Sequence, residues 1–337
     1  MKSVHLLIPD LFLPKDFAVE VCAGLSLSAL EKMLGRGHCE ILDPASLEDM
    51  LCKLFDIPPQ GDAPIAAVSA AFDGLSAGYW LRADPVHLRL QRDQMLLLAH
   101  SEISAEEAGQ MCASLNEYFA GQGMEFFAPH PQRWYVRLDS LPEIRTKPIS
   151  QVIGGDVRRA LPTGADAAQW HRVLNEIQML LFAHRSNESR DERGELTINS
   201  LWLWGASHSD GVSPQKNCGS ASSDEILVEM LAAAADVPFS AWAGQWQDTE
   251  NDGRQLLVWT ALSSALQSGD LAAWRNALQD FESGYAQPLW QALRDGKIAQ
   301  VQLDVLSADG IRRVILTRRD AWSFWRRIRH LDAYSLV

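Results

Sequence analysis

The sequence predicts an α/β protein that contains an α+β region, and three observations lead to this fold class. Short apolar runs typical of buried strands occur near both ends of the chain, and amphipathic helix patterns separate them. Between residues 79 and 138, strand signals follow one another with one helix pattern among them, which is typical of an α+β region. A hydrophobic content of 47% over 337 residues suffices for a large core.

Elements in the first third begin at recognisable signals. A buried strand is predicted at 4–9, and a helix of mainly small residues at 66–72 can pack closely against a sheet. Two other helices begin at capping boxes, in which a Ser and an acidic residue bond each other's backbone: Ser28 with Glu31, and Ser46 with Asp49. Turns are predicted at Asp84–Pro85 and 91–93. They separate strands expected at 79–82, 87–90 and 94–99.

The remaining elements alternate in type. Another capping box, Ser104 with Glu107, begins a helix. Hairpins are predicted at 124–138 and 301–317, a strand at 197–204 and another at 255–261. Helices are predicted around 170–181, 224–235, 270–281 and 288–294. The tail from Arg312 to Arg329 is basic, with Trp322, Phe324 and Trp325 interleaved. A terminal helix that buries these rings is one interpretation, and a binding surface is the other.

Composition narrows the function classes. A net charge of −13 argues against a general nucleic-acid binder. The five cysteines are scattered without a CxxC pair, which is typical of reduced thiols in a cytoplasmic protein. No apolar run approaches 18 residues, so no membrane partner is expected. Phosphate-loop, GxSxG, HExxH and zinc-finger spacings are all missing.

The segment from Leu174 to Gly205 concentrates polar groups that could hold an anion. His184 is expected at the end of a helix, where the dipole favours a protonated imidazole. Arg190 could bind a carboxylate or phosphate with two hydrogen bonds, and the amides of Asn187 and Asn199 could donate beside it. The alternative is structural. In that interpretation His184 caps the helix, Asn187 sets a turn, and Arg190 pairs with Glu188 or Asp191.

This segment also resembles a known family. Its pattern LNExxxxLxxHxxNxxRxxxGxxxxNxxxxxG is similar to the central region of archaeal-type cofactor-independent phosphoglycerate mutases, of the alkaline-phosphatase superfamily. The NSLWLWG strand resembles the bacterial RpfE-type regulatory proteins more closely. Weaker similarity covers residues 83–90 and 133–138, where strands of the mutases bring acidic and basic groups towards phosphoglycerate. The resemblance therefore implies further ligand contacts from Asp84, His87, Arg89, Arg133 and Arg137.

The resemblance also implies a domain organisation. Residues 1–75 together with 206–337 would form an alkaline-phosphatase-like mixed sheet with helices on both faces. Residues 76–205 would form an inserted α+β part that resembles the substrate-binding region of the mutases.

Departures from the family decide the expected function. Such a mutase needs two metal ions, bound by Asp and His residues from both ends of the chain, and a Ser or Thr nucleophile. Asp10 could be a remnant of the N-terminal ligand, but His330 is the only histidine after residue 208. The dimetal centre cannot be assembled. We therefore expect a catalytically degenerate, regulatory protein without a cofactor, which binds a phosphorylated or carboxylate metabolite.

Two alternatives stay open. One is an active phosphoglycerate mutase, or a related metal-dependent phosphotransferase with an atypical site, which would hold Mn or Zn. The other is an interaction protein without a ligand. Its partner would contact the region of Trp242 and Trp246, or the C-terminal tail.

Overall fold

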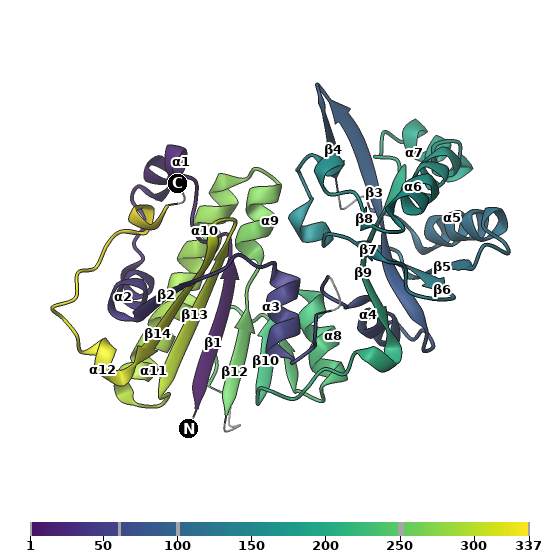
Figure 1. Ribbon diagram of the computed structural model, residues 1–337. Coiled ribbons are helices and arrows are strands. Elements are labelled where there is room, and N and C mark those ends of the chain that lie inside the picture. Colours follow the sequence, from purple (N-terminus) through teal and green to yellow (C-terminus); the bar gives the residue numbers. More distant parts are fainter. Residues whose placement is uncertain (1, 60–61, 99–101, 249–252, 336–337) are drawn as a thin grey trace. The chain divides into compact units, whose positions relative to one another are not determined.

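The computed structural model describes residues 2–59, 62–98, 102–248 and 253–335 (Figure 1). The chain divides into two compact units. Unit 1 comprises Met1–Met50 and Gln215–Val337, and unit 2 comprises Leu51–Pro214. In the described part of the chain, no helix has the length and apolarity needed to cross a membrane.

Unit 1 is built on a seven-stranded mixed sheet, in the order β11-β10-β12-β1-β13-β14-β2. The first five strands of this order run parallel, while β14 is antiparallel to both of its neighbours. The strands are β1 (Ser3–Pro9), β2 (His38–Leu42), β10 (Ser220–Ser223), β11 (Phe239–Ala241), β12 (Arg254–Val258), β13 (Gln300–Ser307) and β14 (Gly310–Thr317).

Helices lie on both faces of this sheet because its crossover connections run in opposite directions. The chain passes from β10 to β11 towards one edge and from β12 to β13 towards the other, and right-handed crossovers then place the connecting helices on opposite faces. The helices are α1 (Lys15–Cys22), α2 (Ser28–Arg36), α8 (Ile226–Ala234), α9 (Ala261–Gln267), α10 (Leu271–Phe281), α11 (Gln287–Asp295) and α12 (Arg318–Ala321). Within α3 (Leu47–Leu54) the chain passes from unit 1 to unit 2.

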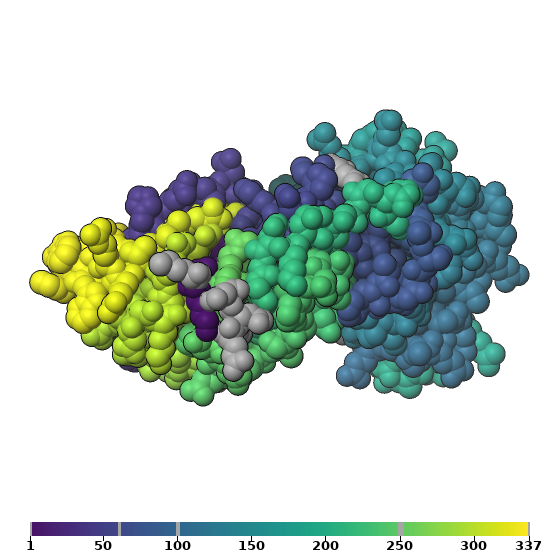
Figure 2. Space-filling model, turned by 90° about the horizontal axis from the view of Figure 1, so that it is seen from below, coloured from purple at the N-terminus to yellow at the C-terminus, as the bar shows by residue number. Residues whose placement is uncertain are grey.

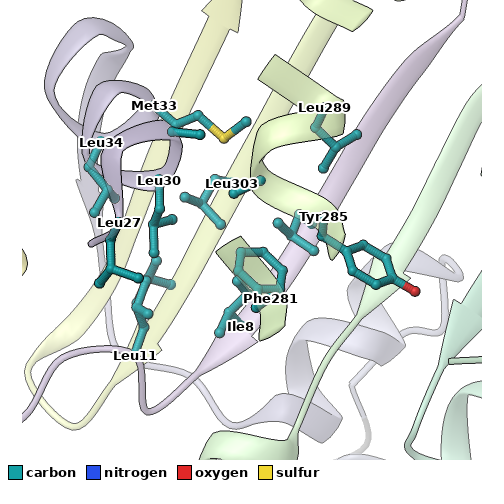
Figure 3. Packing of buried hydrophobic residues seen from close by; sticks show 14 of the residues in the cluster. Ile8, Leu11, Leu27, Leu30, Met33, Leu34, Phe281, Tyr285, Leu289 and Leu303 are labelled. Carbon is teal, nitrogen blue, oxygen red and sulfur yellow. The ribbon is translucent and has the colours of Figure 1, made fainter. Parts of the chain in front are cut away.

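The main core of unit 1 lies on one face of the sheet. Figure 3 shows Leu30, Phe281 and Leu289 from three helices packed over Ile8 and Leu303 of the central strands. Each of these side chains is at most 2% exposed. Burial of this kind contributes about 1.5–3 kcal/mol for each large apolar side chain, so the core holds the central strands in place.

The first turn of α2 is stabilised differently from the sequence-based expectation. Ser28 and Glu31 were expected to form a capping box, but the side chain of Ser28 caps nothing there. Instead the buried carboxylate of Glu282 accepts hydrogen bonds from the N–H groups of Ala29 (2.8 Å) and Leu30 (3.0 Å). A negative charge at a helix N-terminus also opposes the positive end of the dipole. The other two predicted capping boxes are confirmed.

Unit 2 contains an antiparallel sheet in the order β4-β3-β6-β5, with β9 paired to the other side of β3. Helices α5 and α6 cover one face, and the small residues of α4 pack against Trp80 and Tyr135 on the other. The elements are α4 (Ala66–Phe72), β3 (Tyr79–Gln91), β4 (Gln94–Leu98), α5 (Ala105–Tyr118), β5 (Met124–His130), β6 (Arg133–Leu138), β7 (Ile144–Arg145), β8 (Thr163–Gly164), α6 (Ala167–Phe182), α7 (Arg185–Glu192) and β9 (Ser200–His208).

Three local predictions were wrong. Asp84–Pro85 is no turn, because β3 runs unbroken through it and Pro85 pairs with Leu201 of β9. The polar turn expected after His184 is the helix α7. The C-terminal tail does not form one long helix that buries its rings. Its first residues belong to the end of β14, the next form the short helix α12, and the chain then continues without a regular helix or strand. Trp325 is 72% exposed there.

Candidate functional site

The carboxyl ends of the parallel strands in unit 1 bring four polar side chains to one edge of the sheet. Asp224 follows β10, Thr260 follows β12 shortly after it ends, and Asp10 follows β1. The three strands are consecutive in the sheet, so these residues lie side by side at what we call the carboxyl-end edge. Ser263 joins them from α9. In open α/β sheets, ligands bind at this edge.

Backbone geometry fixes the position of Asp10. The residue has φ of 57°, in the left-handed region that Asp tolerates better than most residues. Its N–H donates to the carbonyl of Leu306 (3.1 Å), and its carbonyl accepts from the indole of Trp274 (3.2 Å). The strands on one side and α10 on the other therefore hold Asp10 where β1 ends.

The two carboxyl groups of this edge are held without a cation. Burial raises the pKa of Asp10, and a hydrogen bond with Ser263 only partly opposes this effect. Burial also raises the pKa of Asp224, whose Oδ1 accepts from the backbone N–H of Thr260 at 2.8 Å and from its hydroxyl at 3.2 Å. No arginine, lysine or histidine forms an ion pair with either group within the described residues. Asp10 is partly buried and Asp224 is exposed. Carboxyl groups with raised pKa values are typical of functional sites.

The donor set at the carboxyl-end edge does not fit a dimetal centre. Across the ranges that the structure describes, no three His, Cys, Asp or Glu side chains are grouped so that they could hold a metal ion. His5 lies within β1, where its imidazole bonds Asp304, and His38 lies on β2. His330 contacts Glu31 instead. Asp10 and Asp224 with two hydroxyls supply fewer ligands than two metal ions require.

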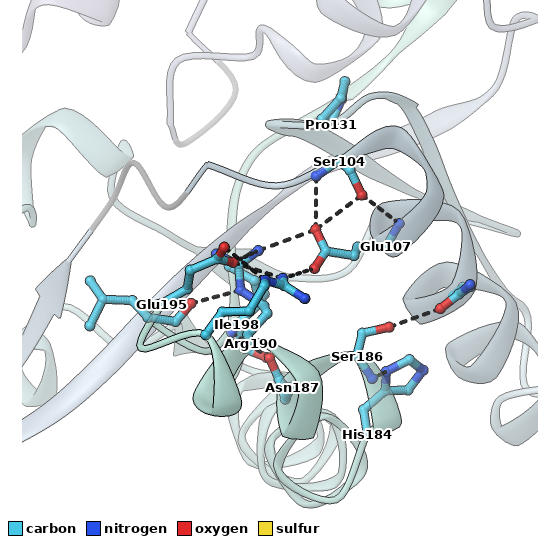
Figure 4. A network of polar contacts seen from close by, with 12 residues as sticks. Ser104, Glu107, Pro131, His184, Ser186, Asn187, Arg190, Glu195 and Ile198 are labelled. Atoms are coloured by element: carbon cyan, nitrogen blue, oxygen red, sulfur yellow. Dashed lines mark hydrogen bonds and ion pairs between the residues drawn. The ribbon is translucent and has the colours of Figure 1, made fainter.

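The polar residues of the segment 184–199 support the backbone of unit 2 (Figure 4). The guanidinium of Arg190 is buried, donates from Nε to the carbonyl of Leu196 (2.8 Å) and from Nη1 to Glu107 (3.3 Å), and lies 3.5 Å from Glu195. These partners differ from the Glu188 and Asp191 of the structural alternative. Arg190 is 1% exposed, so its guanidinium is largely closed off from solvent.

The two asparagines of the segment act as braces between backbone strands. The amide of Asn187 donates to the carbonyls of Leu181 and Ile198, and its oxygen accepts from the N–H of Ile198. Asn199 bonds the N–H and the carbonyl of Leu88 in the same way. Each amide thus saturates backbone groups of a neighbouring segment, and we call Asn187, Arg190 and Asn199 the unit 2 brace.

His184 differs from the sequence-based expectation. It is the N-cap of α7, and its Nδ1 accepts from the N–H of Ser186. Burial lowers its pKa, and a hydrogen bond with the backbone of Gln110 only partly offsets this effect, whereas the sequence predicted a shift that favours the protonated imidazole. Because Nδ1 accepts a hydrogen bond, the neutral ring carries its proton on Nε2, which faces the hydroxyl of Ser114 at 3.1 Å. His184 therefore cannot serve as a base towards Ser114 in this arrangement.

A surface hollow of about 1150 Å³ lies beside His184. Four glutamates, four serines and two arginines contribute to its wall, together with Gln110. Arg193 is engaged with Glu107 (2.7 Å) and Glu195 (2.8 Å), which leaves Arg185 as the cation of this wall without a partner in the described residues. Carboxylates thus outnumber the arginines that could meet an anion there.

Two other predicted residues, Asp84 and Arg133, meet in a buried network that the sequence did not reveal. Arg82 binds Oδ1 of Asp84 and donates to the hydroxyl of Ser69 (2.8 Å). A chain of short hydrogen bonds continues from there through Tyr135 to Asp73, which Arg133 binds with two bonds. Its distances are 2.6 Å for Ser69–Tyr135, 2.5 Å for Tyr135–Asp73, and 2.9 and 2.7 Å for Arg133–Asp73.

This network links α4 to the sheet of unit 2. Ser69 lies on α4, Asp73 directly follows it, and the arginines lie on β3 and β6. The spacing of Arg82 and Asp84 is the feature of the sequence that could have revealed this network, because residues i and i+2 of a strand share one face. The remaining predicted contacts lie apart from it: His87 bonds the carbonyl of Thr197, Arg89 is exposed on β3, and Arg137 pairs with Glu125.

Comparison with solved structures supports the fold. A protein from Pyrococcus horikoshii matches 99% of this chain and 95% of its own, with a TM-score of 0.51 and 13% identity. The cofactor-independent phosphoglycerate mutase from Thermoplasma acidophilum matches the same shares with a TM-score of 0.49 and 15% identity. The chain thus has the mixed α/β architecture of the Pyrococcus horikoshii protein, as its sequence predicted.

Sequence comparison indicates a distant similarity. A scan against protein-family profiles finds no match. The probable 2,3-bisphosphoglycerate-independent phosphoglycerate mutase of Geobacter sulfurreducens is 24% identical over 148 residues, 43% of this chain and 37% of the relative. The 2,3-bisphosphoglycerate-independent phosphoglycerate mutase of Methanosarcina barkeri is 22% identical over 246 residues, 65% of this chain and 62% of the relative. The chain therefore aligns with only part of each relative.

Proposed function

We propose that this protein is a catalytically degenerate relative of the cofactor-independent phosphoglycerate mutases, which acts by binding and not by phosphoryl transfer. The donor set of the carboxyl-end edge carries the proposal. Asp10 and Asp224 are accompanied by hydroxyl groups, and no third carboxylate or imidazole joins them in the part of the chain that the structure describes. Two metal ions that share a phosphoryl group need a larger set of ligands.

In this proposal the protein is regulatory and its ligand is a phosphorylated or carboxylate metabolite. The unit 2 brace then supports the fold near the ligand, because its polar groups already bond the backbone. Direct contact would fall to exposed cations without a structural bond. Arg185 at the hollow and Arg89 on β3 are such groups. A guanidinium of this kind can bind a phosphate or carboxylate with two hydrogen bonds.

Catalysis is tested first. The purified protein is analysed for bound metal and then assayed for phosphoglycerate mutase activity with added Mn²⁺ or Zn²⁺, with and without a chelator. We expect no turnover above the protein-free reaction under any of these conditions. Turnover that the chelator abolishes would contradict the proposal and support the active enzyme.

Binding is tested by calorimetry with 3-phosphoglycerate. We expect Arg185→Ala or Arg89→Ala to weaken binding about tenfold, the loss of one charge-assisted contact. Arg172→Ala is the matched control, since Arg172 is an exposed arginine of α6. Arg190→Ala is unsuitable here because that residue is buried and its loss would disturb the fold. Equal affinity in all variants would overturn the metabolite as ligand.

One observation favours the enzyme alternative. Asp10 and Asp224 have raised pKa values through burial, and hydroxyls of Ser263 and Thr260 lie against them. This pairing of carboxyl and hydroxyl groups is the feature from which an atypical phosphotransferase site could be built. Asp10→Asn distinguishes the two functions, because it would abolish metal-dependent turnover in an enzyme and leave binding of 3-phosphoglycerate to unit 2 unchanged.

A further inference from the structure

Residues 318–330 of unit 1 display aromatic and basic side chains on the surface, and we call this stretch the basic aromatic segment. It carries five arginines against one aspartate, a formal charge of +4 in a chain of −13. Phe324 is 81% exposed and Trp325 72%, and Trp322 and Ile328 are exposed as well. Figure 2 shows the yellow C-terminal atoms at the surface of the unit. Monomeric proteins rarely leave contiguous rings of this size in water without a use for them.

The backbone of the segment is held firmly while its side chains face outwards. Arg36 of α2 donates to the carbonyl of Ala321 (2.8 Å), and Leu331 donates to Glu31 (3.2 Å). Between these points the chain runs against α2 so closely that a Cβ on Gly35 would lie 3.0 Å from the carbonyl oxygen of Arg327. The exposed rings therefore belong to an anchored surface.

Three arginines of this surface are available to a partner. No carboxylate pairs with Arg319, Arg327 or Arg329 in the described ranges. Two of the rings contact each other, Phe324 and Trp325, with centroids 5.3 Å apart and planes at 81°. The segment thus presents exposed rings and, along the same stretch of chain, arginines without a carboxylate partner in the described ranges.

We propose that the basic aromatic segment docks on a phospholipid surface that carries anionic headgroups. Aromatic rings settle at the level of the headgroups, aliphatic side chains reach the acyl boundary, and guanidinium groups bind lipid phosphates. Ile328 supports this partner over a single-stranded nucleic acid, because an aliphatic side chain adds little to base stacking. A symmetric pair of chains would place one +4 surface against another and is disfavoured. This proposal concerns surface contact and replaces the expectation of no membrane partner, which rested on the lack of a spanning run.

The test is sedimentation of the full chain with vesicles. Vesicles of phosphatidylglycerol and phosphatidylcholine in equal parts are compared with vesicles of phosphatidylcholine alone. We expect binding to the anionic vesicles only, and weaker binding in high salt. Arg327→Ser with Arg329→Ser should weaken binding about 30-fold, since each arginine near an anionic surface contributes about fivefold. Phe324→Ser with Trp325→Ser should weaken it at least about tenfold.

The matched control changes Met179 and Phe182 to serine. These residues are 75% and 82% exposed on α6 of unit 2, so the same kind of side chain is removed from another surface. We expect no change in binding. Should the double variant of the segment lose its fold by circular dichroism, Trp325→Ser alone answers the same question.

Four results would overturn the proposal. They are no binding to either vesicle, an equal loss in the control variant, tighter binding of a single-stranded oligothymidylate than of vesicles, and a dimer that the segment variants dissociate.

Discussion

Aspartates at two places on the sheet of unit 1 have pKa values that are shifted in opposite directions. In the middle of the sheet, Asp304 accepts two hydrogen bonds from Arg313, at 2.8 and 2.7 Å, and one from the imidazole of His5 at 2.8 Å. Burial alone would raise its pKa, but these bonds outweigh burial and lower the pKa to about 2. At the carboxyl-end edge, Asp10 and Asp224 meet hydroxyl and N–H groups, and burial raises their pKa.

The difference separates a structural site from a candidate functional one. A buried ion pair with every charge bonded holds strands together, and removing one partner leaves an uncompensated charge. A partly desolvated carboxyl group without a cation lowers stability, which a fold tolerates where a ligand or reaction uses the group. On this basis Asp304 belongs to the framework of unit 1, whereas Asp10 and Asp224 belong to its candidate site.

The largest effect is expected from Asp304→Ala. The change leaves the buried imidazole of His5 and the guanidinium of Arg313 without their acceptor, and we expect unit 1 to lose about 3–5 kcal/mol of stability in urea unfolding. Asp16→Ala is the matched control, since Asp16 is exposed, and it should change stability by less than about 1 kcal/mol. Equal effects of the two changes would break the comparison.

Arg190→Met extends the comparison to unit 2. It removes a buried guanidinium that bonds the carbonyl of Leu196 and leaves Glu107 with one cation fewer. We expect the free energy of unfolding to fall by about 2–4 kcal/mol, and thermal unfolding of the full chain measures this change. Arg193→Met removes an arginine that pairs with the same glutamates but is 47% exposed, and its loss should destabilise the protein clearly less than the loss of Arg190. If the Arg190→Met variant is as stable as the wild type, Arg190 is not needed for the fold and becomes a candidate ligand-binding residue again.

Stability should depend on pH in opposite senses at the two sites. The lowered pKa of Asp304 gives a contribution that is present above the ordinary aspartyl pKa and is lost as pH falls towards 2, in total about 2 kcal/mol. The raised pKa of Asp10 gives a contribution that is complete below the ordinary value and is lost as pH rises through the raised one. Unfolding midpoints of the wild type and of Asp304→Ala are measured from acid to neutral pH. The difference between the two curves gives the contribution of Asp304. A variant that keeps the full acid dependence would refute this assignment.

Asp10→Asn should change stability the least of these variants, and it should raise stability where the others lower it. The amide keeps a hydrogen bond to Ser263 while the desolvated charge is removed, so we expect a gain of a few tenths to about 1 kcal/mol at neutral pH. Calorimetric melting measures it. A loss of stability would show that Asp10 is as structural as Asp304.

Local sequence signals predicted the fold where the stabilising partners are close in the chain. Ser46 with Asp49 forms the expected capping box because its bonds need only adjacent residues. The box at Ser28 did not form, because the carboxylate of Glu282, 253 residues from Ala29, takes the helix N–H groups instead. Pro85 was predicted in a turn, yet pairing with β9 keeps the strand extended. Turn propensity is a weak preference that such pairing overrides.

The candidate site shows the same limit. Asp10 was identified from its place after the first strand, but nothing local connects it with Asp224 or Ser263. Parallel pairing of β1, β12 and β10 brings these groups to one edge. In the segment 184–199, the sequence indicated His184, Asn187, Arg190 and Asn199 as one group of polar residues. Whether their donors face a ligand or the backbone depends on strands that the pattern of one segment does not describe.

By itself, the sequence determined the fold class, most helices and strands, and the shortage of histidines after residue 208. Helices and strands follow from hydrophobic periodicity, which extends over only a few residues. The shortage of histidines follows from a count of residue types. The tertiary structure alone decided which charges are paired. It bound Arg190 and Asp304 to distant partners, left Asp10 and Asp224 without a cation among the described residues, and held the rings of Phe324 and Trp325 in water. Pairing and exposure depend on which segments meet in space, and that arrangement follows from burial over the whole chain.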